Sequence, residues 1–159
     1  MKLLQTALLD ELAAQAAASP RRRAHHNIHA GPSDPVQRFL VVTCRDTYFR
    51  PHRHRTRSEL AIVLRGSFSI LTFDAEGAVT GRYAVGAGTP QFAYETPRDT
   101  FHTLLAESDG AAFFEVKEGP YDPATASEFA PWGAAEGDAR AGAYREWLRG
   151  AAIGARYAL

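Results

Sequence analysis

The sequence has little of several features that define common protein classes. Its only cysteine is Cys44, so the chain can form no internal disulfide framework and no cysteine-rich zinc site. It has no run of about 18 apolar residues, the length that spans a membrane. It carries 18 basic and 18 acidic side chains, and this balance argues against general nucleic-acid binding, which normally needs a basic surplus. The start at Met1–Leu4 resembles a signal peptide, but Asp10 and Glu11 interrupt any apolar segment, so we expect a cytoplasmic protein without membrane or nucleic-acid partners.

What the sequence does contain is the composition of one folded domain. The 159 residues are 45% apolar and 11% aromatic, and 13 glycines and 9 prolines are too few for collagen-like or low-complexity sequence. This length supports one sizeable core, and the chain has no internal repeat, so we predict a single domain over residues 1–159. The six histidines are unevenly distributed, at His25, His26, His29, His52, His54 and His102.

The balanced charge is unevenly distributed along the chain. Residues 21–57 contain nine arginines and two aspartates, whereas residues 107–146 contain nine acidic and three basic side chains. In one interpretation these are solvated loops that pair with each other or across a dimer. In the other, the arginines form a basic rim that gathers an anionic small molecule, such as a phosphate or a carboxylate.

Both ends of the chain predict helices. In residues 2–18 the apolar side chains recur near one face, and Ser19-Pro20 ends the pattern. Residues 19–35 are irregular and rich in Arg and His, and a short last helix is predicted near residues 138–148. The expected organisation is an N-terminal helix and extension over 1–35, a barrel over 36–118, and a C-terminal extension with a helix over 119–159.

The middle of the chain contains short runs rich in β-branched and aromatic residues, which predict strands. These runs span residues 37–43, 47–50, 59–65, 67–74, 78–85, 90–94, 100–106 and 111–117. Turn-forming sequences such as Asp74-Ala75-Glu76-Gly77 separate them. Strands of this length and spacing predict an all-β barrel or sandwich, flanked here by the two terminal helices.

The most informative segment contains His52 and His54. Residues two apart in a strand project from the same face, so both imidazoles point the same way. A tight connection brings Glu59 back beside them on the next strand, and His102 lies near the start of another strand. Three imidazoles and a carboxylate suit Fe, Mn, Ni, Zn or Cu and leave positions for water or substrate. The alternative is that His52 and His54 are surface residues on an arginine-rich edge strand.

These residues also carry a resemblance to a known family. The pattern His52-x-His54-x4-Glu59-x6-Gly66 resembles the first cupin motif, with both ligand spacings intact. The segment Pro97-x-Asp99-x2-His102 resembles the second motif. The chain departs from the motifs at three positions, Asp46, Asp99 and Ala106, which affect turn geometry more than ligation.

The resemblance continues outside the barrel. The N-terminal helix, Ser19-Pro20-Arg21-Arg22-Arg23 and Asp34-Pro35-Val36-Gln37-Arg38 resemble the N-terminal extension of WbuC-type cupins, and Phe129-Ala130-Pro131-Trp132 resembles their C-terminal part. The resemblance implies an all-β cupin fold, a double-stranded β-helix or jelly roll, with an N-terminal helix and a short C-terminal helix. It also implies one divalent transition metal (Fe, Mn, Ni or Zn) on His52, His54, Glu59 and His102, a homodimer, and a role in surface-polysaccharide biosynthesis.

Six further residues are candidates for the site. Arg50 has the strand parity of His52 and His54, so it either anchors a carboxylate or phosphate, or pairs as a rim residue with a C-terminal acid. Glu115 is a candidate catalytic acid or base if its strand turns it inward. Tyr94 and Phe101 are candidate ligand-binding aromatics, although aromatics in a small barrel are more often core.

The histidine-rich extension supplies the other ligand-binding candidates, Asn27 and His29. They either fold over the barrel mouth and touch the ligand or make structural hydrogen bonds, and a second metal site among the histidines is disfavoured because the segment is irregular.

Three functions remain open at the level of sequence. The leading hypothesis is an enzyme that acts on a small polar or anionic molecule, with isomerase, epimerase or lyase chemistry for a redox-inert ion and dioxygenase chemistry for iron. The competing hypothesis is a non-catalytic sensor or binding protein that needs the metal to hold its ligand. The third is a cupin that keeps its metal ligands without a current reaction.

Overall fold

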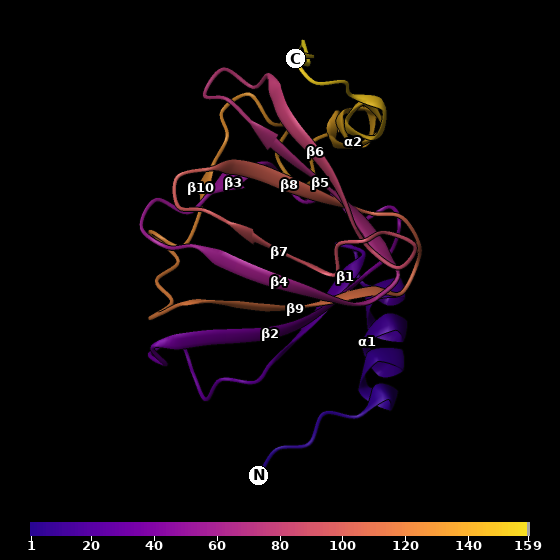
Figure 1. The fold of residues 1–159 in the computed structure, drawn as a ribbon, viewed down its shortest axis with the longest axis vertical. Coiled ribbons are helices and arrows are strands. Elements are labelled where there is room, and N and C mark those ends of the chain that lie inside the picture. Colours follow the sequence, from indigo (N-terminus) through magenta and orange to yellow (C-terminus); the bar gives the residue numbers. More distant parts are fainter. Residues whose placement is uncertain (159) are drawn as a thin grey trace.

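The computed structural model describes residues 1–158, which form two facing antiparallel sheets with a helix packed on the outside of each (Figure 1). The first sheet has the strand order β1-β2-β9-β4-β7, and the second has the order β10-β3-β8-β5-β6. The elements are α1 (Thr6–Ala18), β1 (Arg23–Asn27), β2 (Val36–Thr43), β3 (His52–Arg53), β4 (Glu59–Arg65), β5 (Ser67–Phe73), β6 (Val79–Gly86), β7 (Ala93–Thr96), β8 (Phe101–Ala106), β9 (Ala111–Glu118), β10 (Glu128–Phe129) and α2 (Ala141–Gly150). The predicted all-β architecture with terminal helices is confirmed.

The core between the sheets is built from alternate residues of the central strands. Because successive side chains in a strand point to opposite faces, every second residue faces the other sheet. Phe68 of β5 and Phe113 of β9 meet there edge to face, with ring centroids 5.4 Å apart. The buried members of this inner core are Val41, Ala61, Phe68, Ile70, Val85, Leu104, Ala106, Ala111 and Phe113. They occupy the interior over most of its length and leave the polar groups described below at one end.

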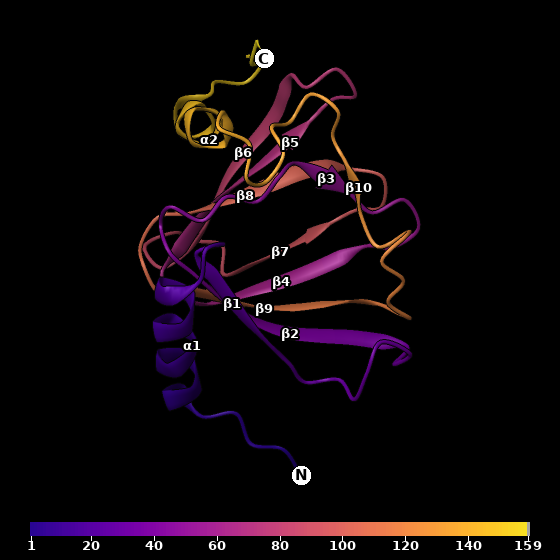
Figure 2. The same cartoon turned by 180° about the vertical axis from the view of Figure 1, so that it is seen from behind.

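One helix packs against the outer side of each sheet (Figure 2). Leu12 and Ala16 of α1 pack on Leu40, Val42 and Ala112 of the first sheet. On the second sheet, α2 buries Tyr144 and Leu148 in a cluster that also contains Leu71, Phe73, Val79, Phe101 and Leu105. Among the described residues, neither helix has the length and apolar character needed to cross a membrane. Since both helices lie outside, the barrel interior stays available for a site.

The conformation of Gly66 shows why the first motif needs a glycine at this position. It lies between β4 and β5 with φ of 66°, a left-handed conformation that costs other residues energy. A Cβ added there would also lie 3.0 Å from the Ser108 hydroxyl and 3.1 Å from the Ala111 Cβ. The turn therefore requires both the conformation and the small size of glycine, and it returns the chain directly from one sheet to the other.

Several predicted elements differ from the structure. The first helix starts at Thr6 and not at residue 2. Residues 47–50 do not form a strand, because the chain turns at Cys44–Thr47, where the Thr47 N–H donates to the Cys44 carbonyl over 3.0 Å. The stretch over 19–35, expected to be irregular, contains β1, and β10 was not expected at all. Both are short polar strands whose formation depends on pairing with β2 and β3, which local sequence does not show.

The packing of α2 predicts a specific loss of stability. Replacing Leu148, which is fully buried, by alanine should cost about 2–5 kcal/mol of unfolding free energy, because it leaves a cavity against the second sheet. Chemical denaturation measures this directly. The matched control is Leu64→Ala at a side chain that is 49% exposed, where a change within about 0.5 kcal/mol is expected. Equal losses in the two variants would show that α2 does not contribute to the core.

Candidate metal centre

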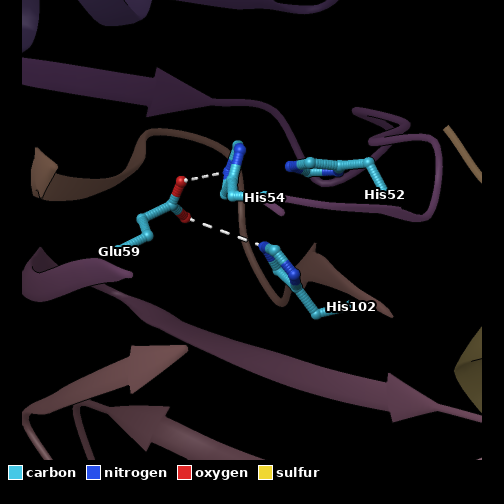
Figure 3. A group of neighbouring side chains, drawn as sticks. All are labelled: His52, His54, Glu59 and His102. Atoms are coloured by element: carbon cyan, nitrogen blue, oxygen red, sulfur yellow. Dashed lines mark hydrogen bonds and ion pairs between the residues drawn. The ribbon is translucent and has the colours of Figure 1, made fainter. Parts of the chain in front are cut away.

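Four side chains from three strands and one loop meet at one end of the barrel (Figure 3). His52 lies on β3 opposite His102 of β8, His54 follows β3, and Glu59 opens β4 in the other sheet. One donor atom from each of the four residues lies within 4.8 Å of all the others. The cluster therefore spans the two sheets, and it unites the four residues that the spacing predicted as ligands.

Each imidazole is oriented by a main-chain carbonyl. His52 Nδ1 donates to the Arg50 carbonyl over 3.0 Å, and His102 Nδ1 donates to the Thr100 carbonyl over 2.9 Å. His54 Nδ1 donates over 2.6 Å to the carbonyl of Ala126, which lies far along the chain. A carbonyl only accepts, so the proton lies on Nδ1, and the neutral ring presents the lone pair of Nε2 to the centre. Metal-binding histidines are held in this way.

Two of the inward-facing nitrogens lie beside Glu59. His102 Nε2 is buried and has no hydrogen-bond partner among residues 1–158, and the nearest Glu59 oxygen is 3.8 Å away. His54 Nε2 lies 3.0 Å from the other Glu59 oxygen. Buried polar atoms are nearly always satisfied, so the unpartnered His102 Nε2 beside the Glu59 carboxylate indicates a place where a cation could be held. A set of three nitrogens and one oxygen fits a divalent transition metal.

Burial and neighbouring charges set the ionisation of the ligands. Burial is the main cause that lowers the pKa of His52 to about 3, and His102 and His54 lower it further, which leaves the imidazole neutral. Burial opposes ionisation of Glu59, but Lys117, His102 and His54 outweigh it and hold the pKa of this carboxyl well below its usual range. A neutral imidazole and an ionised carboxylate are the forms that bind metals.

A buried ion pair extends the cluster inward. Lys117 Nζ lies 3.3 Å from Glu59 Oε2 and 2.6 Å from Glu115 Oε1. Burial disfavours the Lys117 ammonium, but the two carboxylates outweigh this and raise its pKa. Burial and Glu59 raise the pKa of Glu115, and Lys117 opposes them. Glu115 thus faces inward. The sequence analysis did not name Lys117 as a site residue. Its position two residues after Glu115 on a predicted strand places it on the same face as Glu115, which could have identified it.

A cavity of about 210 Å³ adjoins the cluster. Its lining includes His52, Glu59, Glu115 and Lys117, so two of the four predicted ligands and the ion pair are reached from it. Arg50 also lines the cavity, and its Nη2 donates to the Ala130 carbonyl over 2.9 Å.

Arg50 has no carboxylate partner among residues 1–158, and its buried Nε has no hydrogen-bond acceptor. The C-terminal segment does contact it, but through a carbonyl and not through an acid.

The C-terminal extension forms a wall of the site. Strand β10 pairs with β3, which places Phe129 opposite His52 with ring centroids 6.1 Å apart. The same ring lies 5.2 Å below the Arg50 guanidinium. Together with the Ala126 carbonyl on His54, these contacts show that residues 126–130 hold three members of the site. Sequence reasoning missed this segment, because only long-range pairing identifies it.

The two predicted ligand-binding aromatics lie in different places. Tyr94 faces the interior in a cross-strand row with Ala61 and Glu115. Burial, followed by the charges of Glu59 and Glu115, raises its pKa. The prediction for Phe101 is wrong: its ring packs outside the barrel against Trp132, 5.6 Å away. Phe101 precedes the inward-facing His102, so strand alternation turns it to the opposite face.

Asn27 and His29 do not line the metal cavity. They belong to a separate pocket of about 300 Å³ beside β1 and β2. His29 is nearly buried, and its Nδ1 hydrogen-bonds to the main chain of Arg38 over 3.0 Å. Neither residue therefore lies at the metal cavity. Their contact with a ligand stays a prediction, and the structural hydrogen bond of His29 is present.

Comparisons with known proteins identify the fold. A family model described as "Domain of unknown function (DUF6016)" matches residues 4–85, about half of the chain. No curated protein matches the chain.

Solved structures of similar fold include CapF, a capsular polysaccharide assembling protein from Staphylococcus aureus, with a TM-score of 0.56, 16% identity and coverage of 70% of this chain and 32% of that chain. Oxalate decarboxylase from Bacillus subtilis matches with a TM-score of 0.52, 19% identity and coverage of 67% and 27%. A recombinant oxalate oxidase in complex with glycolate matches with a TM-score of 0.53, 17% identity and coverage of 73% and 59%.

These neighbours are cupin-fold proteins, so the predicted cupin fold is confirmed. The chain spans less than two thirds of the length of each of the three. The matching family model gives no specific support for the WbuC type, so the resemblance to that type stays a prediction of the sequence.

The cluster predicts that metal binding depends on His102. In His102→Ala the metal content after purification, measured by elemental analysis, should fall sharply, because an inward-facing nitrogen is lost. Changes in the outer shell of a metal site already cost about 10- to 100-fold in affinity, and loss of a ligand should cost more. His26→Ala is the matched control, since this exposed histidine lies outside the cluster. Equal metal content in the two variants would contradict the assignment.

Proposed function

Because this chain belongs to the family described as "Domain of unknown function (DUF6016)", whose description names no activity, we propose a function from the site itself. The protein binds one divalent transition metal on His52, His54, Glu59 and His102 and acts on a small anionic molecule in the adjoining cavity. The observation that carries this proposal is the convergence of three imidazole lone pairs and a carboxylate, with His102 Nε2 buried and unpartnered. When bound, such an ion supplies Lewis acidity to a ligand oxygen or a water molecule.

The charges around the cavity favour an anionic ligand. The carboxylates of Glu59 and Glu115 are offset by Lys117 and by a divalent ion, which leaves the Arg50 guanidinium uncompensated. Because Arg50 lines the cavity and has no carboxylate partner among residues 1–158, its guanidinium can donate to a carboxylate or phosphate. Arg50 is therefore proposed as the anchor of the ligand's negative charge.

Glu115 supplies the second chemical group. Its carboxylate lines the same cavity and is held by Lys117, so it can exchange a proton with a ligand bound between Arg50 and the metal ligands. A fixed carboxylate beside a Lewis-acid site suits proton transfer next to a polarised carbonyl. We therefore favour isomerase, epimerase or lyase chemistry. No specific contact in residues 1–158 favours dioxygenase chemistry or a purely sensory role.

The ligand is further proposed to derive from a carbohydrate. This follows the resemblance to WbuC-type cupins, and CapF, one of the proteins of similar fold, is described as a capsular polysaccharide assembling protein. That likeness is one of fold. A homodimer and a role in polysaccharide biosynthesis stay predictions of the sequence.

Removal of the metal should separate structure from function. The core clusters are formed by apolar packing away from the four ligands, so a chelated protein should keep its fold and lose only the few degrees of melting temperature that ligand linkage supplies. Binding of glycolate, the smallest hydroxycarboxylate probe, should be lost in calorimetry and return with added metal. Unfolding on chelation would instead assign the metal a structural role.

Replacement of Arg50 by glutamine should weaken glycolate binding without changing metal content. Hydrogen bonds to charged groups contribute about 1.5–3 kcal/mol, so a loss of about 10- to 150-fold in affinity is expected. Arg98→Gln is the matched control, since this side chain is 63% exposed and pairs with Glu118 away from the cavity. If both variants bound glycolate as the unaltered protein does, Arg50 would not be the anchor.

A further inference from the structure

A second pocket lies on the same inner face of the first sheet, at the edge formed by β1 and β2. In antiparallel pairs, directly opposite residues project to the same side. His25 is opposite Val41 and Asn27 is opposite Phe39, so both β1 side chains lie on the inner face of the first sheet, although at this edge they are exposed. The pocket has a volume of about 300 Å³, and Tyr121 of the C-terminal extension also contributes to its lining.

The pocket differs from the metal cavity in its chemistry. Of the described residues that line it, none is Lys, Arg, Asp or Glu. The polar lining consists of imidazole, amide and phenol groups, and Phe39 adds an aromatic surface. Burial, followed by Arg21 and Arg23, lowers the pKa of His25, so its ring is uncharged at neutral pH.

Several of these polar groups are free to bind. Within residues 1–158 the side-chain amide of Asn27 and the hydroxyl of Tyr121 make no hydrogen bond to protein, and His29 uses only its Nδ1. Amides, imidazoles and phenols both donate and accept, as hydroxyl groups do, and aromatic rings pack against the apolar face of a sugar-like ring. The pocket therefore fits an uncharged group that is rich in hydroxyls.

The pocket and the metal cavity are lined by residues of two adjacent strands, β2 and β9. Gln37 of the pocket is paired with Lys117, and Phe39 is paired with Glu115. Lys117 and Glu115 line the metal cavity, and the Lys117 ammonium lies 5.3 Å from the Phe39 ring centroid. Residues that line one hollow thus lie directly beside residues that line the other.

We propose that this pocket is a second subsite, which binds the uncharged, hydroxyl-rich part of a ligand whose anionic group occupies the metal cavity. The proposal rests on the proposed function for its anionic half. Typical small-molecule sites have volumes of about 300–1,000 Å³, and the metal cavity alone is smaller than this. The second pocket supplies the missing volume. The ligand class is then a carboxylate attached to a polyhydroxylated ring, as in a sugar acid.

The test compares two probes on the metal-loaded full chain. Glucuronate carries both a carboxylate and ring hydroxyls, whereas glycolate carries the carboxylate with a single hydroxyl. Calorimetry should show tighter binding of glucuronate by the unaltered protein. Asn27→Ala and Tyr121→Phe should each weaken glucuronate binding about three- to tenfold, the value of one lost hydrogen bond, and leave glycolate binding unchanged. Tyr121→Phe removes only a hydroxyl and so carries little risk to folding.

His26→Ala is the control for β1, because this exposed residue pairs with Leu40 of the outer face and should change neither affinity. Equal losses for both probes in Asn27→Ala and Tyr121→Phe, or no loss for either, would overturn the subsite and leave the metal cavity standing. Failure of glycolate to bind the metal-loaded protein would count against the proposed function instead. In that case the subsite is tested with methyl glucoside, a neutral probe. If Tyr121→Phe does not weaken the binding of methyl glucoside, the subsite is overturned as well.

Discussion

The carboxylate of Glu59 is the group around which the polar end of the barrel is organised. A charge buried between two sheets costs several kcal/mol unless other charges and hydrogen bonds compensate it. His54 and Lys117 approach one of its oxygens at 3.0 and 3.3 Å, and His102 approaches the other. Lys117 in turn requires the second carboxylate of Glu115. This chain of pairing leaves Arg50 as the cavity's cation without a carboxylate partner among residues 1–158, and the proposal of an anionic ligand rests on this.

The surrounding fold orients the side chains of this arrangement. The three imidazoles are each tied to a main-chain carbonyl, and the carbonyls belong to three separate segments. Residues 126–130 close the side of the site by pairing with β3 and contacting Arg50. Because both helices pack on the outer faces, they do not fill the space that a ligand needs. The apolar core and the polar site therefore occupy different ends of one interior.

Much of the fold was predictable, because strand periodicity and turn residues are local properties. The strands at β2, β4, β5, β8 and β9 lie within a residue or two of their expected bounds. The errors have separate causes. Strand β1 is polar and exists because it pairs with β2. Residues 47–50 resemble a strand in sequence but form none, because the chain turns just before them at Cys44–Thr47. The prediction for Phe101 is inconsistent with its own strand: residues next to each other point to opposite faces, and His102 faces inward, so Phe101 must face outward.

The sequence by itself determined the composition of the cluster, since the spacing of His52, His54 and Glu59 and the turn before His102 are readable along the chain. Tertiary structure decided what surrounds it. The carbonyl that orients His54 lies 72 residues away, and the Lys117 partner of Glu59 lies 58 residues away. The second pocket likewise exists only because β1 extends the sheet beside β2. Such contacts depend on which distant segments pack together, and local periodicity carries no information about that packing.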